Sequence, residues 1–140
     1  MQDPIEKITL KCGTMSEDQS IKDLIKKLHE DRSNFIVVVN GDGRVAGIAT
    51  ENDLMKLMKL QPFPGMQAVV NENIGEDTFN QPVSGIMTKD PKRVKNTATT
   101  KDVLHAMISQ EVRYLLVVDD ENRPIGYVRL SDVMKNMVNE

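Results

Sequence analysis

Hydrophobic and polar positions along the chain change period in a fixed order. Apolar side chains recur every three or four residues between 21 and 28, a spacing that places them on one face of a helix. Residues 35–39 are all apolar, which predicts a buried strand. The polar run 40–43 then predicts a turn, because Asn and Gly tolerate positive φ. A short extended segment near Met15 precedes this pattern, and a second strand through Gly47 and a Met-rich helix complete it.

The same order of periods returns 79 positions later (132 minus 53), so that residues 4–61 align with 83–140 without a gap. The identical pairs include Val38/Val117, Val39/Val118, Arg44/Arg123, Gly47/Gly126 and Asp53/Asp132. The sequence therefore predicts an α/β (α+β) fold of two tandem β-α-β-β-α units, with residues 62–82 as a linker. A unit of about 55 residues buries too little surface to be stable alone. We therefore expect the two units to pack together around a pseudo-twofold axis.

The helix starts carry a shared local signal, a hydroxyl residue followed three positions later by a carboxylate. This capping-box pattern occurs at Ser20–Asp23, Thr99–Asp102 and Thr50–Asp53. Taken by itself, the box at Thr50 is fully explained by the start of a helix, without a ligand. The repeat breaks the pattern at the matching place, where Arg129 stands before Asp132.

Composition narrows the class of partner. The net charge of −3 argues against nucleic acid, and the basic stretch 89–95 is interpreted as a solvated loop. The longest apolar run, 35–39, is far shorter than a membrane span, and residues 1–4 lack the pattern of a signal peptide. A lone Cys12 excludes an internal disulfide and favours the cytoplasm.

Side chains suited to catalysis or metal binding are scattered. His29 and His105 do not occupy equivalent repeat positions, and neither has a nearby cysteine or a carboxylate at ligand spacing. Cys12 has no histidine close in sequence that could activate it. We therefore expect neither a metal site nor an enzyme.

Two motifs carry a resemblance to a known family. The second strand runs into a helix through Gly-apolar-apolar-Thr-x-x-Asp, residues 47–53, and residues 83–88 read Val-Ser-Gly-Ile-Met-Thr. With the tandem β-α-β-β-α pair, these motifs resemble the CBS domain family in its paired form, the Bateman module, and in particular its stand-alone members. In the first unit residues 4–9 depart from the second motif, which makes the boundary there less distinct.

The resemblance implies a cleft between the units that binds AMP, ADP, ATP or S-adenosylmethionine as a regulatory ligand, with no cofactor required. In the family pattern the terminal Asp holds the ribose hydroxyls, the Thr faces phosphate and apolar strand residues enclose the adenine. Carried over to the first unit, the ligand-binding residues are Thr14, Met15, Ile36, Val37, Gly47, Ala49, Thr50 and Asp53. In the second unit they are Val94, Leu115, Leu116, Gly126, Val128, Arg129 and Asp132.

Several interpretations stay open at this stage. Arg129 can reach a phosphate, fill the pocket or form a salt bridge with Asp132. A glycine inside a strand indicates either a bulge or the close approach of a ligand at Gly47 and Gly126. The first hypothesis for function is a sensor that signals the level of an adenosine ligand to an unknown protein partner. The alternative is a ligand-free interaction or scaffold domain.

Methionines at helical spacing favour a homodimer. Met55 and Met58 recur as Met134 and Met137 on the helices that close the two units. Methionine at such positions is typical of a core or of a subunit interface, and an interface is favoured here because polar residues alternate with the methionines.

Overall fold

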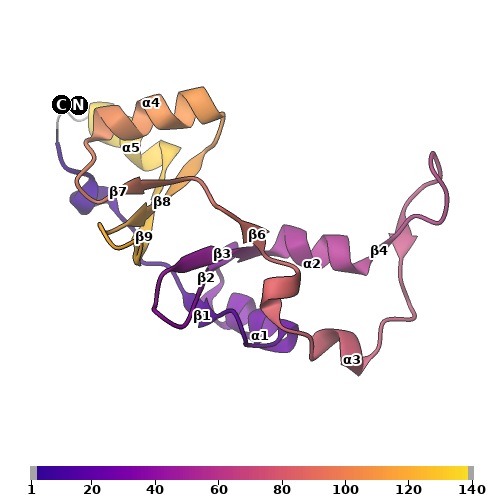
Figure 1. Ribbon diagram of the computed structural model, residues 1–140. Coiled ribbons are helices and arrows are strands. Elements are labelled where there is room, and N and C mark those ends of the chain that lie inside the picture. The colour runs from indigo at the N-terminus through magenta and orange to yellow at the C-terminus, as the bar shows by residue number, and fades with distance from the viewer. Residues whose placement is uncertain (1–2, 139–140) are drawn as a thin grey trace. The chain divides into compact units, whose positions relative to one another are not determined.

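The computed structural model describes residues 3–138, which form two compact units (Figure 1). The central unit contains residues 13–41 and 46–90. The C-terminal unit contains the chain up to Cys12, residues 42–45 and the chain from Pro91 onward. The C-terminal unit therefore combines segments that lie far apart in the sequence.

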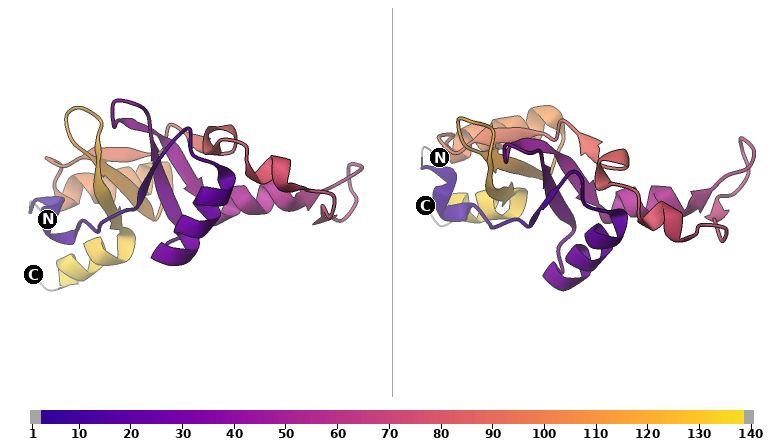
Figure 2. Two further views of the ribbon diagram at one scale, coloured as in Figure 1. Left: turned by 90° about the horizontal axis from the view of Figure 1, so that it is seen from below. Right: turned by 60° about the horizontal axis from the view of Figure 1, so that its bottom comes forward.

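The central unit is built on a sheet of strand order β1-β2-β3-β6. Its strands are β1 (Thr14–Ser16), β2 (Phe35–Val39), β3 (Val45–Thr50) and β6 (Thr88–Lys89). Its helices are α1 (Ile21–Asp31), α2 (Glu51–Met58) and the short α3 (Glu76–Phe79), with a 3-10 turn η2 (Val83–Gly85). A small hairpin of β4 (Lys59–Leu60) and β5 (Val69–Val70) extends beyond the end of α2 (Figure 2).

The C-terminal unit repeats this plan on a sheet of order β7-β8-β9. Its strands are β7 (Arg93–Lys95), β8 (Tyr114–Val118) and β9 (Pro124–Arg129), and its helices are η1 (Ile5–Ile8), α4 (Thr100–Gln110) and α5 (Leu130–Val138). The first two strands of each sheet are parallel, as a crossover helix requires. The predicted β-α-β-β-α order is thus confirmed in both repeats.

Local chemistry explains where the helices begin and end. The Oγ of Ser20 accepts a hydrogen bond from the Asp23 backbone N–H at 3.1 Å, and the Asp23 carboxylate accepts from the Ser20 N–H at 3.4 Å. The same reciprocal box forms at Thr50 and Thr99, which confirms the predicted caps. At their other ends α1 and α4 stop at left-handed residues, Arg32 and Glu111.

Each unit has its own apolar core. The central core contains Met15, Leu24, Leu28, Ile36, Val38, Ala49 and Val83. The C-terminal core contains Ile5, Val103, Met107, Leu115, Val117, Val128 and Val133. In both cores one residue, Val83 or Ile5, comes from a segment that the sequence assigns to the other repeat.

We call the segments 3–10 and 81–88 the lead-in segments. The Ile5 N–H donates to the Ala98 carbonyl at 3.4 Å, and the Val83 N–H donates to the Gln19 carbonyl at 2.7 Å. Leu10 then pairs with Tyr127 on β9, as Thr88 pairs with Ile48 on β3. Each lead-in segment therefore completes the sheet and the core of a unit whose helices belong to the other repeat.

The pairing corrects the gapless alignment over these segments. Pro4 bridges to Thr99 and Pro82 bridges to Ser20, so the lead-in segments are related by 78 positions (82 minus 4). The helix caps, Ser20 and Thr99, are related by 79 positions (99 minus 20). In this register Ile5 and Ile8 match Val83 and Ile86, whereas the other residues of the first lead-in segment still depart from the motif, with Leu10 in place of Thr88.

The extra residue of the second repeat lies just before β7. The Val37 N–H donates to the Gly13 carbonyl as the Leu116 N–H donates to that of Lys92, which restores the 79-residue shift. Asp90 and Pro91 thus stand where the first repeat has Cys12 alone. Asp90 has a positive φ of 51°, which accommodates the inserted residue in a tight bend.

We expect Ile5→Ala to destabilise the protein by about 2–4 kcal/mol, because it leaves a cavity in the C-terminal core. Ile5 is fully buried there, whereas Ile108 on α4 is 69% exposed. Ile108→Ala is therefore a matched control. Urea unfolding followed by circular dichroism measures both, and equal stability of the two variants would show that the lead-in segment is not part of the core.

Candidate functional site

The turn from β3 into α2 positions the motif residues of the central unit. Thr50 is the N-cap of α2, and its Oγ1 accepts from the Asp53 N–H at 3.2 Å. The Oδ2 atom of Asp53 accepts from the Thr50 N–H at 2.9 Å and from the Thr50 Oγ1 at 3.1 Å. Unlike a cap on the surface, the Asp53 side chain is buried, with only 7% exposure. The motif thus places a buried carboxylate at the start of a helix.

The second oxygen of Asp53 has a distant partner. Its Oδ1 accepts from the Thr88 Oγ1 at 3.3 Å, and Thr88 lies on β6 in the lead-in segment. Because an ionised carboxylate has about four acceptor positions, Oδ1 can accept a further hydrogen bond beside that of Thr88. Sequence reasoning did not include Thr88 in the site, although the motif 83–88 ends on it.

The C-terminal unit holds the equivalent carboxylate in a different way. Arg129 donates to Asp132 through Nε at 2.9 Å and through Nη2 at 3.2 Å, a bidentate pair. The hydrogen bond and the charge of Asp132 raise the pKa of Arg129 above its ordinary value. Leu10, the counterpart of Thr88 in the corrected register, pairs with β9 here and offers no hydroxyl. Of the three interpretations of Arg129, the structure shows the salt bridge.

Backbone packing accounts for the two strand glycines. A Cβ on Gly47 would lie 2.6 Å from the Thr88 carbonyl oxygen, and one on Gly126 would lie 2.1 Å from that of Leu10. Both distances are too short for a side chain to be accommodated without moving the backbone. The lead-in segments therefore require glycine at these positions, and a ligand is not needed to explain them.

Strand alternation divides the apolar candidates. Five of them belong to the unit cores: Met15, Ile36, Ala49, Leu115 and Val128. Val94 packs against the C-terminal core. Val37 and Leu116 point to the opposite sheet face because side chains alternate along a strand, and both are buried. Thr14, which pairs with Val37 between β1 and β2, is exposed.

Val94 also lines a hollow of about 280 Å³ in the C-terminal unit. The cationic side chains around this hollow, Arg93 and Lys95, are balanced by Asp119 and Asp120. The Lys95 Nζ lies 3.7 Å from an Asp120 carboxylate oxygen. The hollow is therefore close to neutral and is not a strong anion site.

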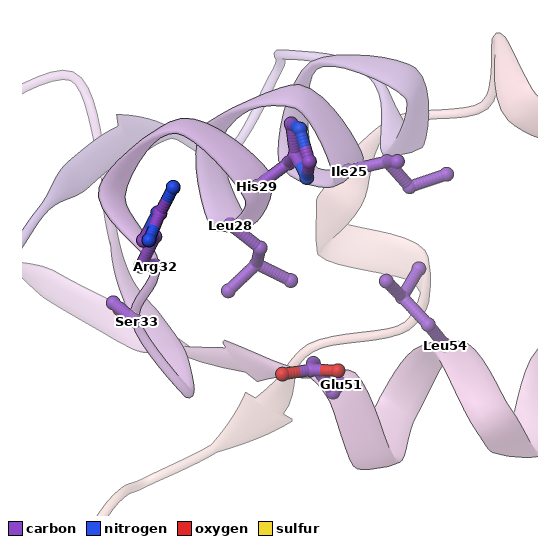
Figure 3. A pocket seen from close by; sticks show the side chains of 7 residues that line it. All are labelled: Ile25, Leu28, His29, Arg32, Ser33, Glu51 and Leu54. Carbon is purple, nitrogen blue, oxygen red and sulfur yellow. The ribbon is translucent and has the colours of Figure 1, made fainter.

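A larger pocket of about 380 Å³ lies between α1 and α2 in the central unit (Figure 3). Its lining residues are Ile25, Leu28, His29, Arg32, Ser33, Glu51 and Leu54. None of these residues was predicted as a site residue. In the view of Figure 3 the Glu51 carboxylate lies on the α2 side, and Arg32 and His29 lie on the α1 side.

The repeat explains why this pocket exists. Ser33 and Glu51 of the central unit correspond to Val112 and Leu130, 79 positions later, and both of these pack against the C-terminal core. Two polar side chains therefore replace two apolar ones that close the gap between α4 and α5. The pocket is the result of weaker helix packing, and its mixed lining shows no constellation of groups arranged for a reaction.

The remaining candidate chemistry is limited within residues 3–138. That range holds no group of three His, Cys, Asp or Glu residues that could bind a metal ion. Burial raises the pKa of the Cys12 thiol, which keeps the sulfur protonated and weakly nucleophilic. In the same range, no helix is long and apolar enough to cross a membrane.

Two tandem β-α-β-β-α repeats, each with a carboxylate near the start of its closing helix, define a paired repeat module. The family model of the CBS domain matches residues 4–60 and 83–139, and the chain belongs to that family, whose paired domains are regulatory modules. The predicted family and fold class are thus confirmed.

Known proteins and solved structures are similar to this chain over nearly its whole length. An uncharacterised protein of Methanocaldococcus jannaschii is 26% identical over 152 residues, covering 96% of this chain and 90% of its own length. The structure of CBSX2 in complex with AMP has a TM-score of 0.71 at 17% identity, covering 98% of this chain and 97% of that one. The cytosolic domain of the Mg²⁺ channel MgtE in complex with ATP has a TM-score of 0.72 at 20% identity, covering 97% and 49%.

We expect Gly126→Ala to destabilise the ligand-free protein by about 1–3 kcal/mol, the usual range for overpacking. The added methyl group would collide with the Leu10 carbonyl oxygen. Gly85→Ala is the control, because a Cβ there meets nothing within 4 Å. Thermal unfolding without nucleotide measures both variants. If Gly126→Ala leaves the stability unchanged, backbone packing does not require this glycine, and the close approach of a ligand becomes its explanation.

Proposed function

We propose that the chain is a regulatory module that binds an adenosine ligand, AMP, ADP, ATP or S-adenosylmethionine, and signals its level to a protein partner. The observation that carries this proposal is the buried Asp53 carboxylate at the start of α2, which keeps acceptor capacity on Oδ1. Vicinal ribose hydroxyls donate to such a carboxylate, and the free N–H groups of a helix start attract phosphate. The AMP and ATP complexes of CBSX2 and MgtE support the choice of ligand class.

The central unit is the better of the two carboxylate sites for a ribose. Asp53 is held by neutral donors, the hydroxyls of Thr50 and Thr88 and one backbone N–H. Asp132 is held by a guanidinium, and charge-assisted bidentate pairs are stronger than neutral hydrogen bonds. A sugar hydroxyl therefore displaces or joins the partners of Asp53 more easily than it displaces Arg129.

Thr14 and Val37 complete the proposal for the central unit, because they are the predicted base-contacting residues that lie outside its apolar core. They are direct partners across β1 and β2. A base lying beside this strand pair would contact the exposed Thr14, while the fully buried Val37 would support the strand from within. The roles of Met15, Ile36 and Ala49 are then to support these strands from the core side.

The route of the signal follows from Thr88. Ligand hydroxyls at Asp53 compete for the oxygen that accepts the Thr88 hydrogen bond, and Thr88 lies on β6, a few residues before β7 begins. A change at Asp53 thus acts on the segment that connects the central unit to the C-terminal unit. Binding would alter the relative stability of two states of that connection, as a regulatory ligand must.

A homodimer in the cytoplasm is part of the same proposal. Exposed apolar side chains on the helices favour a second copy, in particular Ile25 on α1, Ile108 on α4 and Met134 on α5.

The alternative function, a ligand-free scaffold, is favoured by another observation. Within residues 3–138 every buried side-chain N and O atom already has a hydrogen-bond partner.

We expect one of the four ligands to raise the melting temperature of the protein, and Asp53→Asn to abolish that rise. A ligand at a hundredfold excess over its Kd stabilises by about 2.7 kcal/mol. The matched control is Asp23→Asn, which alters an equivalent capping box on α1 of the same unit. Comparing the ligand-induced shift, rather than the melting temperature itself, removes the effect of the lost cap.

Two results would contradict this proposal. A ligand-induced shift that survives Asp53→Asn would place binding elsewhere. No shift with any of the four ligands at millimolar concentration, for a protein that unfolds cooperatively, would favour the scaffold function.

We expect Arg129→Thr to open the second site and to raise the ligand stoichiometry from one to two per chain. The substitution releases Asp132 and restores the Thr-x-x-Asp motif that the first repeat has at Thr50. Isothermal titration calorimetry measures the stoichiometry. The control is Arg123→Thr, which removes an exposed arginine whose Nη1 lies 2.9 Å from Glu121. If the Arg129→Thr variant no longer binds the ligand that the unaltered protein binds, Arg129 itself contacts the phosphate.

A further inference from the structure

The segment between the repeats forms a small hairpin of β4 and β5. Lys59 pairs with Val70 and Leu60 pairs with Val69, and the connecting loop lies outside both ranges that match the family. The Gln61 side-chain Nε2 donates to the Met66 carbonyl at 2.8 Å, and the Met66 N–H donates to the Phe63 carbonyl at 3.2 Å. The loop is therefore closed by hydrogen bonds of its own.

This hairpin exposes apolar side chains that its own fold leaves uncovered. All four strand residues are exposed, so the hairpin has no buried face. The exposed fractions are 64% for Phe63, 49% for Met66, 54% for Val69 and 65% for Val70. A two-stranded sheet is marginally stable alone, and contact with another surface would stabilise it.

A groove of about 510 Å³ lies between this hairpin and α2. Its lining residues are Asn52, Met55, Lys56, Met58, Lys59, Ala68, Val69 and Val70. We call this the hairpin groove. Methionine side chains adapt to the shape of an inserted partner, which suits such a lining.

Charge indicates what the hairpin groove accepts. Between residues 55 and 70 the only charged side chains are Lys56 and Lys59, although the whole chain has a net charge of −3. Both lysines line the groove, and the lining contains no carboxylate. A partner with apolar side chains flanked by carboxylates is therefore complementary.

We propose that the hairpin groove binds an acidic amphipathic helix of another protein. A groove bounded by a helix and a hairpin receives the apolar stripe of a helix, while the two lysines meet its flanking carboxylates. A second copy of this chain fits less well, because a twofold contact places each patch against itself and brings lysines together. A lipid surface fits less well because this surface is concave. The proposal deepens the proposed function by naming the surface that the protein partner binds. It rests on the proposed function only for the link between ligand binding and partner binding.

Fluorescence anisotropy with two labelled synthetic peptides tests this proposal. Each peptide has about 18 residues, or five helical turns, with leucines along one face. One peptide carries glutamates beside the leucines, and the other carries lysines. We expect the full-length protein to bind the glutamate peptide about tenfold more tightly than the lysine peptide, a difference of about 1.4 kcal/mol.

Matched variants locate the binding. Val70→Asp should weaken binding of the glutamate peptide about tenfold, whereas Ile125→Asp, at another exposed apolar residue, should not change it. Lys56→Glu combined with Lys59→Glu should reverse the preference between the peptides. Lys22→Glu combined with Lys26→Glu on α1 is the control for total charge.

Other outcomes overturn the proposal. Equal binding of both peptides, or binding that survives Val70→Asp, would remove the acidic helix as the partner. A dimer that Val70→Asp dissociates in light scattering would identify a second copy as the occupant. Sedimentation with phosphatidylglycerol vesicles that depends on Phe63 would identify a membrane surface. Because the peptide titrations are run without nucleotide, their failure is distinct from failure of the Asp53 experiment.

Discussion

The close backbone contact between each lead-in segment and a central strand is the constraint on which the rest of the structure depends. Gly47 lies under the Thr88 carbonyl and Gly126 under that of Leu10, with no space for a side chain at either place. Only with this contact do Val83 and Ile5 reach the cores that they complete. Neither repeat has a full sheet and core from its own residues, so the folding of each requires the other part of the chain.

The same contact makes two similar repeats chemically different. In the central unit it brings the Thr88 hydroxyl to Asp53, while in the C-terminal unit the corresponding position holds Leu10. Arg129 then satisfies the carboxylate that a hydroxyl does not reach. The two repeats therefore differ in what holds the carboxylate. Neutral donors hold Asp53, whereas Asp132 is held by a cation, because Leu10 replaces Thr88 and Arg129 replaces Thr50. The proposed preference for a ligand in the central unit is a direct consequence.

Local patterns predicted what depends on neighbours in sequence. Residues close in sequence determine the capping boxes, the apolar strand β2 and the polar turn after it. The repeat then predicted that both halves share one fold. The exchange of lead-in segments could not be predicted from the sequence. It pairs residues such as Pro4 and Thr99, and the local spacing of apolar residues does not indicate that they lie close together. The glycines were noticed for their position, yet their partner was backbone rather than ligand. Asp132 was found with its salt bridge as one alternative, whereas Thr88 was missed because its role requires a contact 35 residues away.

Helix α2 connects the two proposed binding regions. Its first turn contains Asp53, and its last turn, with Met55 and Met58, forms one wall of the hairpin groove. A helix of eight residues is about 12 Å long and behaves as a rigid element. Any movement of its start on exchange of the Thr50 or Thr88 hydrogen bonds would therefore shift its end by a similar amount. Since the hairpin begins at Lys59, directly after α2, that movement would change the width of the groove, which gives ligand binding a physical route to partner affinity.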